Sequence, residues 1–418
     1  MELLTDIFYI GLQECDLDDH RGIKYLGAIT STCSAWRNAA LGTPLLWRRI
    51  IYKDHCDDVP PESKDPAIPQ HMKERLLEYL SRSKGCSILV HLEFGANSFQ
   101  TQAVKRIVRP HLPRCLSISL RGKIDDFLPL PGELYRLTEF ACAAGHPGGD
   151  ESTRPSIFTD PERVTLRKLT LTETRLPLDN INVQDLEDVL LSSSCDTWPA
   201  GATFISRCHS LTTLIITDDK TFGEEQSFTP FTLPHLIYLD IVGLTIFTAA
   251  RTPSLQTLIL NNVYCDEFRG TVIQLPSLPG LTTLCVMCAD ANSVEIMSLL
   301  ALNPGIKRLI LSECDGIYDV IQSLKGDGTG GAANTDDTTL LPSLSLLQVC
   351  ECSDLGLDEF RALFTHRPTL RIEYGATCGP CYMHVDTLKA TIEEPSQDDE
   401  PDVFTLWNFR TRVVVRED

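Results

Sequence analysis

A leucine pattern of the form LxxLxL recurs along the second half of the chain, and it limits the possible folds more than any other feature. The first positions of successive copies lie 25, 19, 26, 25 and 38 residues apart. Leucine-rich repeats have units of about 20–29 residues, each with one strand and a returning helix or turn. Six clear copies are Leu211-Leu214-Ile216, Leu236-Leu239-Ile241, Leu255-Leu258-Leu260, Leu281-Leu284-Val286, Ile306-Leu309-Leu311 and Leu344-Leu347-Val349.

Weaker copies precede Leu211, in CLSISL, LTEFAC, LRKLTL and LEDVLL. Before them, HMKERLLEYLSRSK has helical spacing of its apolar residues and SILVHLEF alternates like a strand. The pattern predicts an α/β fold in which residues 70–377 form an irregular leucine-rich-repeat solenoid. Its parallel sheet would be curved, with helices and turns on the convex side. Helices are expected at GIYDVIQSLK and LDEFRALF.

The net charge and the cysteine content limit which cellular location and which classes of binding partner are expected. The chain has 37 basic and 57 acidic residues, a net charge of −20, which disfavours nucleic acid and anionic membranes. Its start, MELLTDIF, lacks the basic and apolar regions of a signal peptide, so the 16 cysteines are expected to be reduced. A cytoplasmic or nuclear location is predicted, with no membrane-spanning segment.

The first fifty residues predict three short helices. Apolar residues four apart in ELLTDIF share one helical side, and GIKYLGAITSTCSAWRNAAL repeats that spacing. Thr43 and Pro44 are typical of a helix start, which predicts a third helix through TPLLW as far as Ile50. So small a bundle buries little surface, and a partner often covers the remainder.

ELLTDIF, CSAWRNAAL and TPLLW, in this order and spacing, resemble the F-box of proteins that are especially abundant in fungi. The resemblance covers about an eighth of the chain and implies docking on a Skp-type adaptor that leads to a cullin ubiquitin ligase. By resemblance, the residues that form or support the adaptor face are Leu3, Leu4, Ile7, Phe8, Cys33, Trp36, Pro44, Leu46 and Trp47. The family usually has Leu-Pro just before the ELL triplet, which is missing here, through a short chain start or a weaker docking turn. An alternative is that these helices simply cap the solenoid.

The remaining regions are assigned by composition. Residues 1–52 are predicted to be the F-box-like module and 53–69, rich in Asp, Glu, Pro and Lys, a linker. The Gly/Asp/Thr-rich stretch 326–339 is predicted to be a surface insertion on one repeat, and its GxGxxG match follows a helix, unlike a dinucleotide site. Residues 378–418 form a C-terminal segment in which 393–402 is expected to be disordered.

A row of residues between the inward-facing pairs is predicted to lie on the concave face, where a protein substrate would bind. The alternatives are that the C-terminal segment VFTLWNFRTRVVV folds back over this row, or that irregular packing buries it. The row and its polar neighbours provide the candidate substrate-binding residues Ile215, Tyr238, Asp240, Ile259, Cys285, Arg308, Ile310 and Gln348, with Thr257 and Thr283 beside them.

The sequence contains only weak indications of an enzymatic site or a metal site. Cys378-Gly-Pro-Cys381 matches a thioredoxin-like redox motif, but only 37 residues follow it, too few for that fold. The cysteines at 350, 352, 378 and 381 with His384 have irregular spacing for structural zinc. We therefore expect no catalytic residues, no cofactor and no metal.

The sequence predicts a non-catalytic receptor that joins a Skp adaptor, and through it a cullin scaffold, to an unknown protein substrate. The alternative is a leucine-rich-repeat scaffold without a ligase role.

Overall fold

The computed structural model divides into two compact units, Met1–Leu211 and Thr212–Asp418. The structure describes residues 2–13, 21–54, 68–95, 100–122, 134–143, 157–172, 181–192, 198–217, 230–242, 250–261, 277–287, 293–314, 316–325, 340–350, 357–375, 407–408 and 411–412. It also describes the single residues 124, 127, 128, 130, 174, 178 and 352. The predicted insertion 326–339, nearly all of the linker 53–69, and both Cys378 and Cys381 lie outside these ranges.

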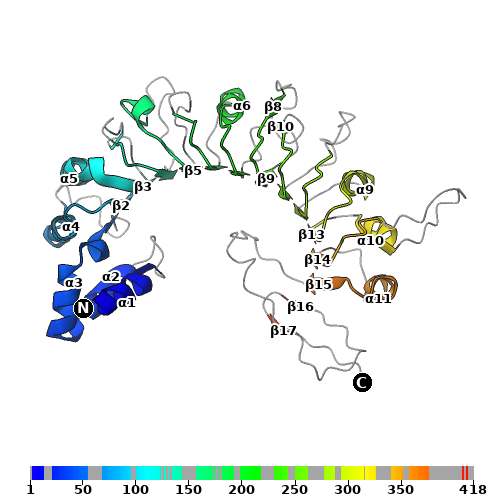
Figure 1. Ribbon diagram of the computed structural model, residues 1–418, viewed down its shortest axis with the longest axis horizontal. Coiled ribbons are helices and arrows are strands. Elements are labelled where there is room, and N and C mark those ends of the chain that lie inside the picture. Colours follow the sequence, from blue (N-terminus) through cyan, green and yellow to red (C-terminus); the bar gives the residue numbers. More distant parts are fainter. Residues whose placement is uncertain are drawn as a thin grey trace, which may run out of the picture. The chain divides into compact units, whose positions relative to one another are not determined.

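The described residues of the first unit form the N-terminal helices and parallel strands in the order β1-β2-β3-β4-β5-β6. Helices α4 and α5 lie along one face of the sheet near β1 to β3 (Figure 1). The elements are α1 (Glu2–Gln13), α2 (Arg21–Thr32), α3 (Ser34–Gly42), the 3-10 helix η1 (Pro44–Trp47), β1 (Arg49–Lys53), α4 (Gln70–Arg82), β2 (Ile88–Phe94), α5 (Thr101–Val108), η3 (Arg109–Arg114), β3 (Cys115–Gly122), β4 (Glu139–Ala143), η5 (Pro161–Arg163), β5 (Lys168–Thr172), β6 (Asp188–Ser192) and α6 (Trp198–Ser206).

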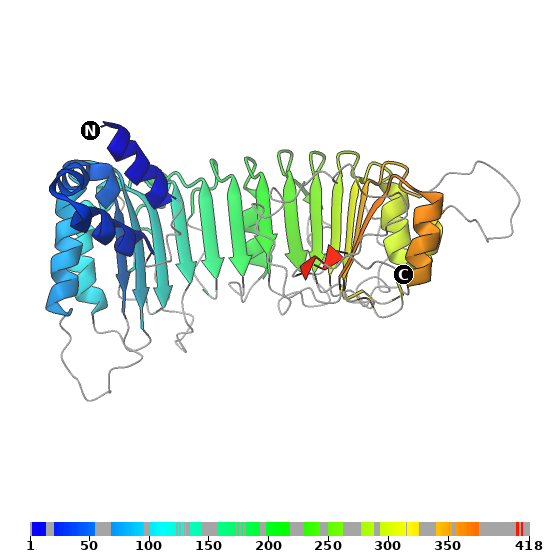
Figure 2. The same cartoon turned by 90° about the horizontal axis from the view of Figure 1, so that it is seen from below.

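In the described part of the second unit, the main sheet is parallel with the strand order β7-β9-β11-β12-β13-β14-β15. Figure 2 shows these strands side by side and running in one direction. The elements are β7 (Thr213–Ile216), β8 (Phe231–Thr232), β9 (Tyr238–Val242), β10 (Ala250–Arg251), β11 (Thr257–Asn261), β12 (Thr283–Met287), α9 (Ser293–Leu302), β13 (Arg308–Ser312), α10 (Tyr318–Lys325), β14 (Leu346–Cys350), α11 (Leu357–His366), β15 (Arg371–Gly375), β16 (Trp407–Asn408) and β17 (Thr411–Arg412).

The LxxLxL pattern has a direct structural basis in both its turn and its strand. The first leucine is buried in a tight turn, as where the Leu255 amide donates to the Thr252 carbonyl at 3.2 Å. The next two amides, of Gln256 and Thr257, both donate to the Ile237 carbonyl of the preceding repeat. The other two pattern residues lie two apart on the strand and are buried in the core. The predicted repeat fold, with a parallel sheet, is therefore confirmed.

Two helices in the last repeats agree with their sequence patterns, and two cysteines follow the strands of these repeats. Helices α10 and α11 form where helical spacing predicted them. Cys314 and Cys352 are buried just after strands β13 and β14. Their thiols donate to the carbonyls of Ser312 and Cys350, both at 3.2 Å, so each satisfies a backbone acceptor where the chain leaves the sheet.

The N-terminal region differs from the predicted elements in two places. The helix expected from Pro44 to Ile50 is a single 3-10 turn, and Ile50 belongs to β1, which pairs in parallel with β2. The predicted second helix is interrupted at Cys33, which caps α3. The chain from Arg49 therefore belongs to the sheet, because Ile50 and Tyr52 are fully buried there and a strand can bury both on one face.

Candidate interaction surfaces

The N-terminal helices form a small core of their own. Buried residues from α1, α2, α3 and η1 pack together, with Tyr79 of α4 against them. This core contains Phe8, Leu12, Leu26, Ile29, Ala39, Ala40, Leu46 and Trp47. Three residues of the predicted adaptor face, Phe8, Leu46 and Trp47, therefore lie inside this core.

Trp47 connects this core to α4. Its side chain is only 3% exposed, and its indole N–H donates to the Ala40 carbonyl at 2.8 Å. The Tyr79 ring meets it edge-on at 5.0 Å between centroids, and the Arg82 guanidinium lies 4.3 Å from the centre of the indole ring. Burial raises the pKa of the Tyr79 hydroxyl, so Tyr79 stays neutral at physiological pH.

An apolar stripe remains uncovered on α1. Leu3 and Ile7 are 74% and 52% exposed, and Ile10, one turn further, is also exposed. Their spacing of four and three places them on one helical side. Trp36 and Leu45 are also exposed on elements that pack on α1; the Trp36 ring lies 5.0 Å from the Phe8 ring, and Leu45 belongs to η1.

The other predicted adaptor residues are Leu4, Pro44 and Cys33, which differ in their exposure to solvent. Leu4 and Pro44 are partly buried, and Leu4 packs against the helical core. Cys33 is exposed, and its sulfur accepts the Trp36 amide hydrogen at 3.4 Å as the cap of α3. Ile10 and Leu45 were not among the predicted residues, although Ile10 continues the Leu3 and Ile7 stripe by one helical turn.

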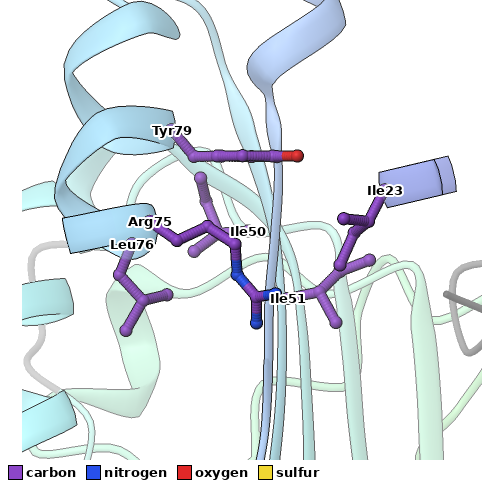
Figure 3. A pocket seen from close by; sticks show the side chains of 6 residues that line it. All are labelled: Ile23, Ile50, Ile51, Arg75, Leu76 and Tyr79. Atoms are coloured by element: carbon purple, nitrogen blue, oxygen red, sulfur yellow. The ribbon is translucent and has the colours of Figure 1, made fainter. Parts of the chain in front are cut away.

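A small pocket lies where α2, β1 and α4 meet (Figure 3). Its lining is mostly apolar, with Arg75 the single charged side chain. Its volume is about 10 Å³, room for roughly one water molecule. The pocket is therefore a packing defect between the helices and the sheet, and too small for an organic ligand. It is lined by Ile23, Ile50, Ile51, Arg75, Leu76 and Tyr79.

The second unit aligns the predicted concave row on seven neighbouring strands. Strand registers place these residues at equivalent positions, so their side chains leave the same face of the sheet. This outward row, here called the strip, consists of Ile215, Asp240, Ile259, Cys285, Ile310, Gln348 and Glu373. Glu373 was missed because its repeat lacks the leucine pattern, although RIEYG alternates like the other strands.

Burial along the strip changes with position. Ile215 and Asp240 are partly exposed, whereas all five residues from Ile259 to Glu373 are buried, and Cys285 is only 1% exposed. Ile259, Cys285 and Ile310 form an apolar cluster against which Tyr238 and Met287 pack. The strip therefore has an apolar centre, with Asp240 on one side of it and Gln348 and Glu373 on the other.

The open end of the strip contains a partly buried carboxyl group, that of Asp240. Asn261 donates to Asp240 at 2.6 Å, and burial raises the pKa of Asp240 to about 6. Burial and the nearby Asp240 charge raise the pKa of the Tyr238 hydroxyl. Asp240 is thus a carboxylate at neutral pH that gains from a positively charged neighbour.

The other end combines an amide with a second carboxylate. Gln348 donates to Glu373, and Arg371 lies 2.8 Å from the other carboxylate oxygen of Glu373. The side-chain oxygen of Gln348 is buried and has no hydrogen-bond donor within the described part of the chain. Arg308 lies in the neighbouring row, in register with Thr283 and Leu346.

No family model and no curated protein matches the chain. A solved leucine-rich-repeat protein from Leptospira interrogans aligns with 13% identity and a TM-score of 0.24, covering 74% of this chain and 93% of that one. The repeat fold consequently rests on the strand registers. Within the described ranges, no helix could cross a membrane and no group of three or more His, Cys, Asp or Glu residues could hold a metal.

Proposed function

We propose that this protein is a non-catalytic receptor whose N-terminal helices bind a Skp-type adaptor of a cullin ubiquitin ligase. The repeat sheet of the second unit would bind the protein substrate. Partner enzymes would then transfer ubiquitin, and the receptor would act by raising the local concentration of its substrate.

The observation that carries the proposal is the apolar stripe on α1. A soluble helix normally turns its large apolar residues inward, and α1 does so with Phe8 and Leu12. Its opposite side nonetheless presents Leu3, Ile7 and Ile10 to solvent. Contiguous exposed apolar groups of this kind mark contact surfaces, and this one lies within the segment that resembles an F-box.

The well-packed helical core supports the same interpretation. A bundle that only capped the sheet would need one apolar side, directed at the sheet. Here Trp47, Tyr79 and Arg82 already make that connection, and the stripe is additional. An additional apolar side is explained by a second protein.

The test is co-purification of the full-length chain with a Skp-type adaptor. Ile7→Asp should weaken binding at least about tenfold, because a charge would be buried at the centre of an apolar contact. Lys24→Gln is the matched control, since it changes net charge equally at an exposed position on α2.

Three outcomes are informative. Binding by the native chain that Ile7→Asp abolishes and Lys24→Gln preserves supports the proposal. Equal binding by all three chains places the contact elsewhere. No retention of adaptor by the native chain favours the alternative, a leucine-rich-repeat scaffold without a ligase role.

A further inference from the structure

We propose that the strip is an interaction surface occupied by a segment of the same chain, the C-terminal hairpin of β16 and β17. A protein partner would have to displace this hairpin. The proposal refines the substrate-binding part of the proposed function, but its first test involves no partner.

The burial pattern requires a cover over one end of the strip. Outward residues of central strands in the first unit, such as Ala141, Thr170 and Leu190, are partly exposed. They show how much burial neighbouring strands alone provide. The buried residues of the strip exceed that level, most clearly Glu373, whose strand β15 comes last in the strand order of the described sheet.

The hairpin is placed where such a cover is needed. Strand β16 packs against β15, and β16 pairs with β17 in an antiparallel hairpin. In Figure 1 the hairpin lies on the side of β15 that faces away from α11. That is the face from which the strip residues project, because the core-facing residues point toward the helices.

The chemistry of the two segments is complementary. Residues 403–416, VFTLWNFRTRVVVR, contain eight apolar residues and three arginines, with no acidic residue, in a chain of net charge −20. The strip has an apolar centre between the carboxyl groups of Asp240 and Glu373, and the Gln348 oxygen lacks a donor among the described residues. A basic, apolar strand therefore suits it, and a competing partner segment should have the same character.

A natural thiol on the strip provides the assay. Cys285 lies at the centre of the apolar cluster, so its alkylation rate by iodoacetamide measures access to the strip. In the full-length chain Cys285 should react slowly. Trp407→Asp, in β16, should raise its rate by about tenfold or more, because the hairpin would dissociate without opening the core. Site-resolved mass spectrometry follows each cysteine separately.

Internal controls are present in the same chain. Cys33 is exposed and should react quickly throughout, whereas Cys314 is buried in the second unit and should stay protected. Ser396→Asp adds the same charge outside the hairpin and should leave Cys285 protected. A synthetic peptide of residues 403–416 added to the Trp407→Asp chain should restore protection.

Two results would overturn the proposal. Unchanged Cys285 reactivity in both Trp407→Asp and the double variant Trp407→Asp/Arg412→Glu would mean that the strip is closed by the sheet itself. An equal rise at Cys314 would make the hairpin part of the core and not a displaceable segment. Neither result depends on adaptor binding, so failure here leaves the adaptor proposal to its own test.

Discussion

Replacing Trp47 with alanine should loosen the N-terminal helices from the sheet. The indole is almost completely buried, donates one hydrogen bond to Ala40, and contacts Tyr79 and Arg82 of α4. Truncation of a buried tryptophan costs about 3–5 kcal/mol, a range that includes the cavity. The lost hydrogen bond and cation–π contact place this site toward the upper half, about 4–5 kcal/mol.

The appropriate measurement is native-state amide hydrogen exchange of peptides from α1 to α3. It reports the free energy of local opening and does not require the whole chain to unfold in a single step. Trp47→Ala should lower the opening free energy of α3 by that amount, while peptides from β4 to β6 should keep their protection.

Trp36→Ala is the matched control, because it removes the same side chain from the same module. Trp36 is 36% exposed and contacts Phe8 from the surface, so its loss should be about 1 kcal/mol. Equal losses for the two variants, or a loss below about 1 kcal/mol for Trp47→Ala, would refute the role assigned to Trp47.

Two further predictions concern buried polar groups of the second unit. The folded pKa of Asp240, about 6, lies above its unfolded value, so the protonated form favours folding. Its contribution should be complete below about pH 4 and be lost as pH rises through 6, a change on the order of 2–3 kcal/mol. Asp240→Asn should remove this part of the pH dependence, seen as a smaller change in thermal midpoint between pH 4 and 7; an identical profile would contradict it. Asn303 accepts the Leu278 amide hydrogen at 2.7 Å and donates to the Leu299 carbonyl at 2.7 Å. Asn303→Ala should cost about 2–4 kcal/mol in urea unfolding followed by circular dichroism, because a buried amide and carbonyl both lose partners; a cost below 1 kcal/mol would mean that water replaces the side chain.

The repeat fold could be predicted because its signal is local and repeated. Each LxxLxL copy specifies one buried turn residue and two inward strand residues, and every additional copy confirms the same register. The positions of Ile259, Cys285 and Ile310 on one row followed from this register alone. The short helix expected at Pro44 was wrong beyond Trp47, since burial in the sheet overrides the helical start signal for Ile50.

Exposure could not be predicted in the same way, because it depends on segments far apart in sequence. Trp36 and Trp47 both belong to the residues that carry the F-box resemblance. Trp36 is nevertheless partly exposed, whereas Trp47 is covered by α4, which lies some thirty residues later in the chain. The sequence left open whether the strip was free or covered by residues after position 400. Strand periodicity gives a residue's face, whereas its burial depends on what packs on that face.

These two surfaces differ in a way that bears on how such a receptor would work. The α1 stripe is open in the isolated chain, so an adaptor could bind it without any prior rearrangement. The strip is buried from Ile259 to Glu373, and under the hairpin proposal a partner reaches this part only by separating β16 from β15. If both proposals hold, adaptor binding should be fast and independent of the C-terminal segment, whereas substrate binding should be slowed by it. Trp407→Asp would then accelerate substrate capture and leave adaptor affinity unchanged, and a change in both would mean that the two surfaces are coupled.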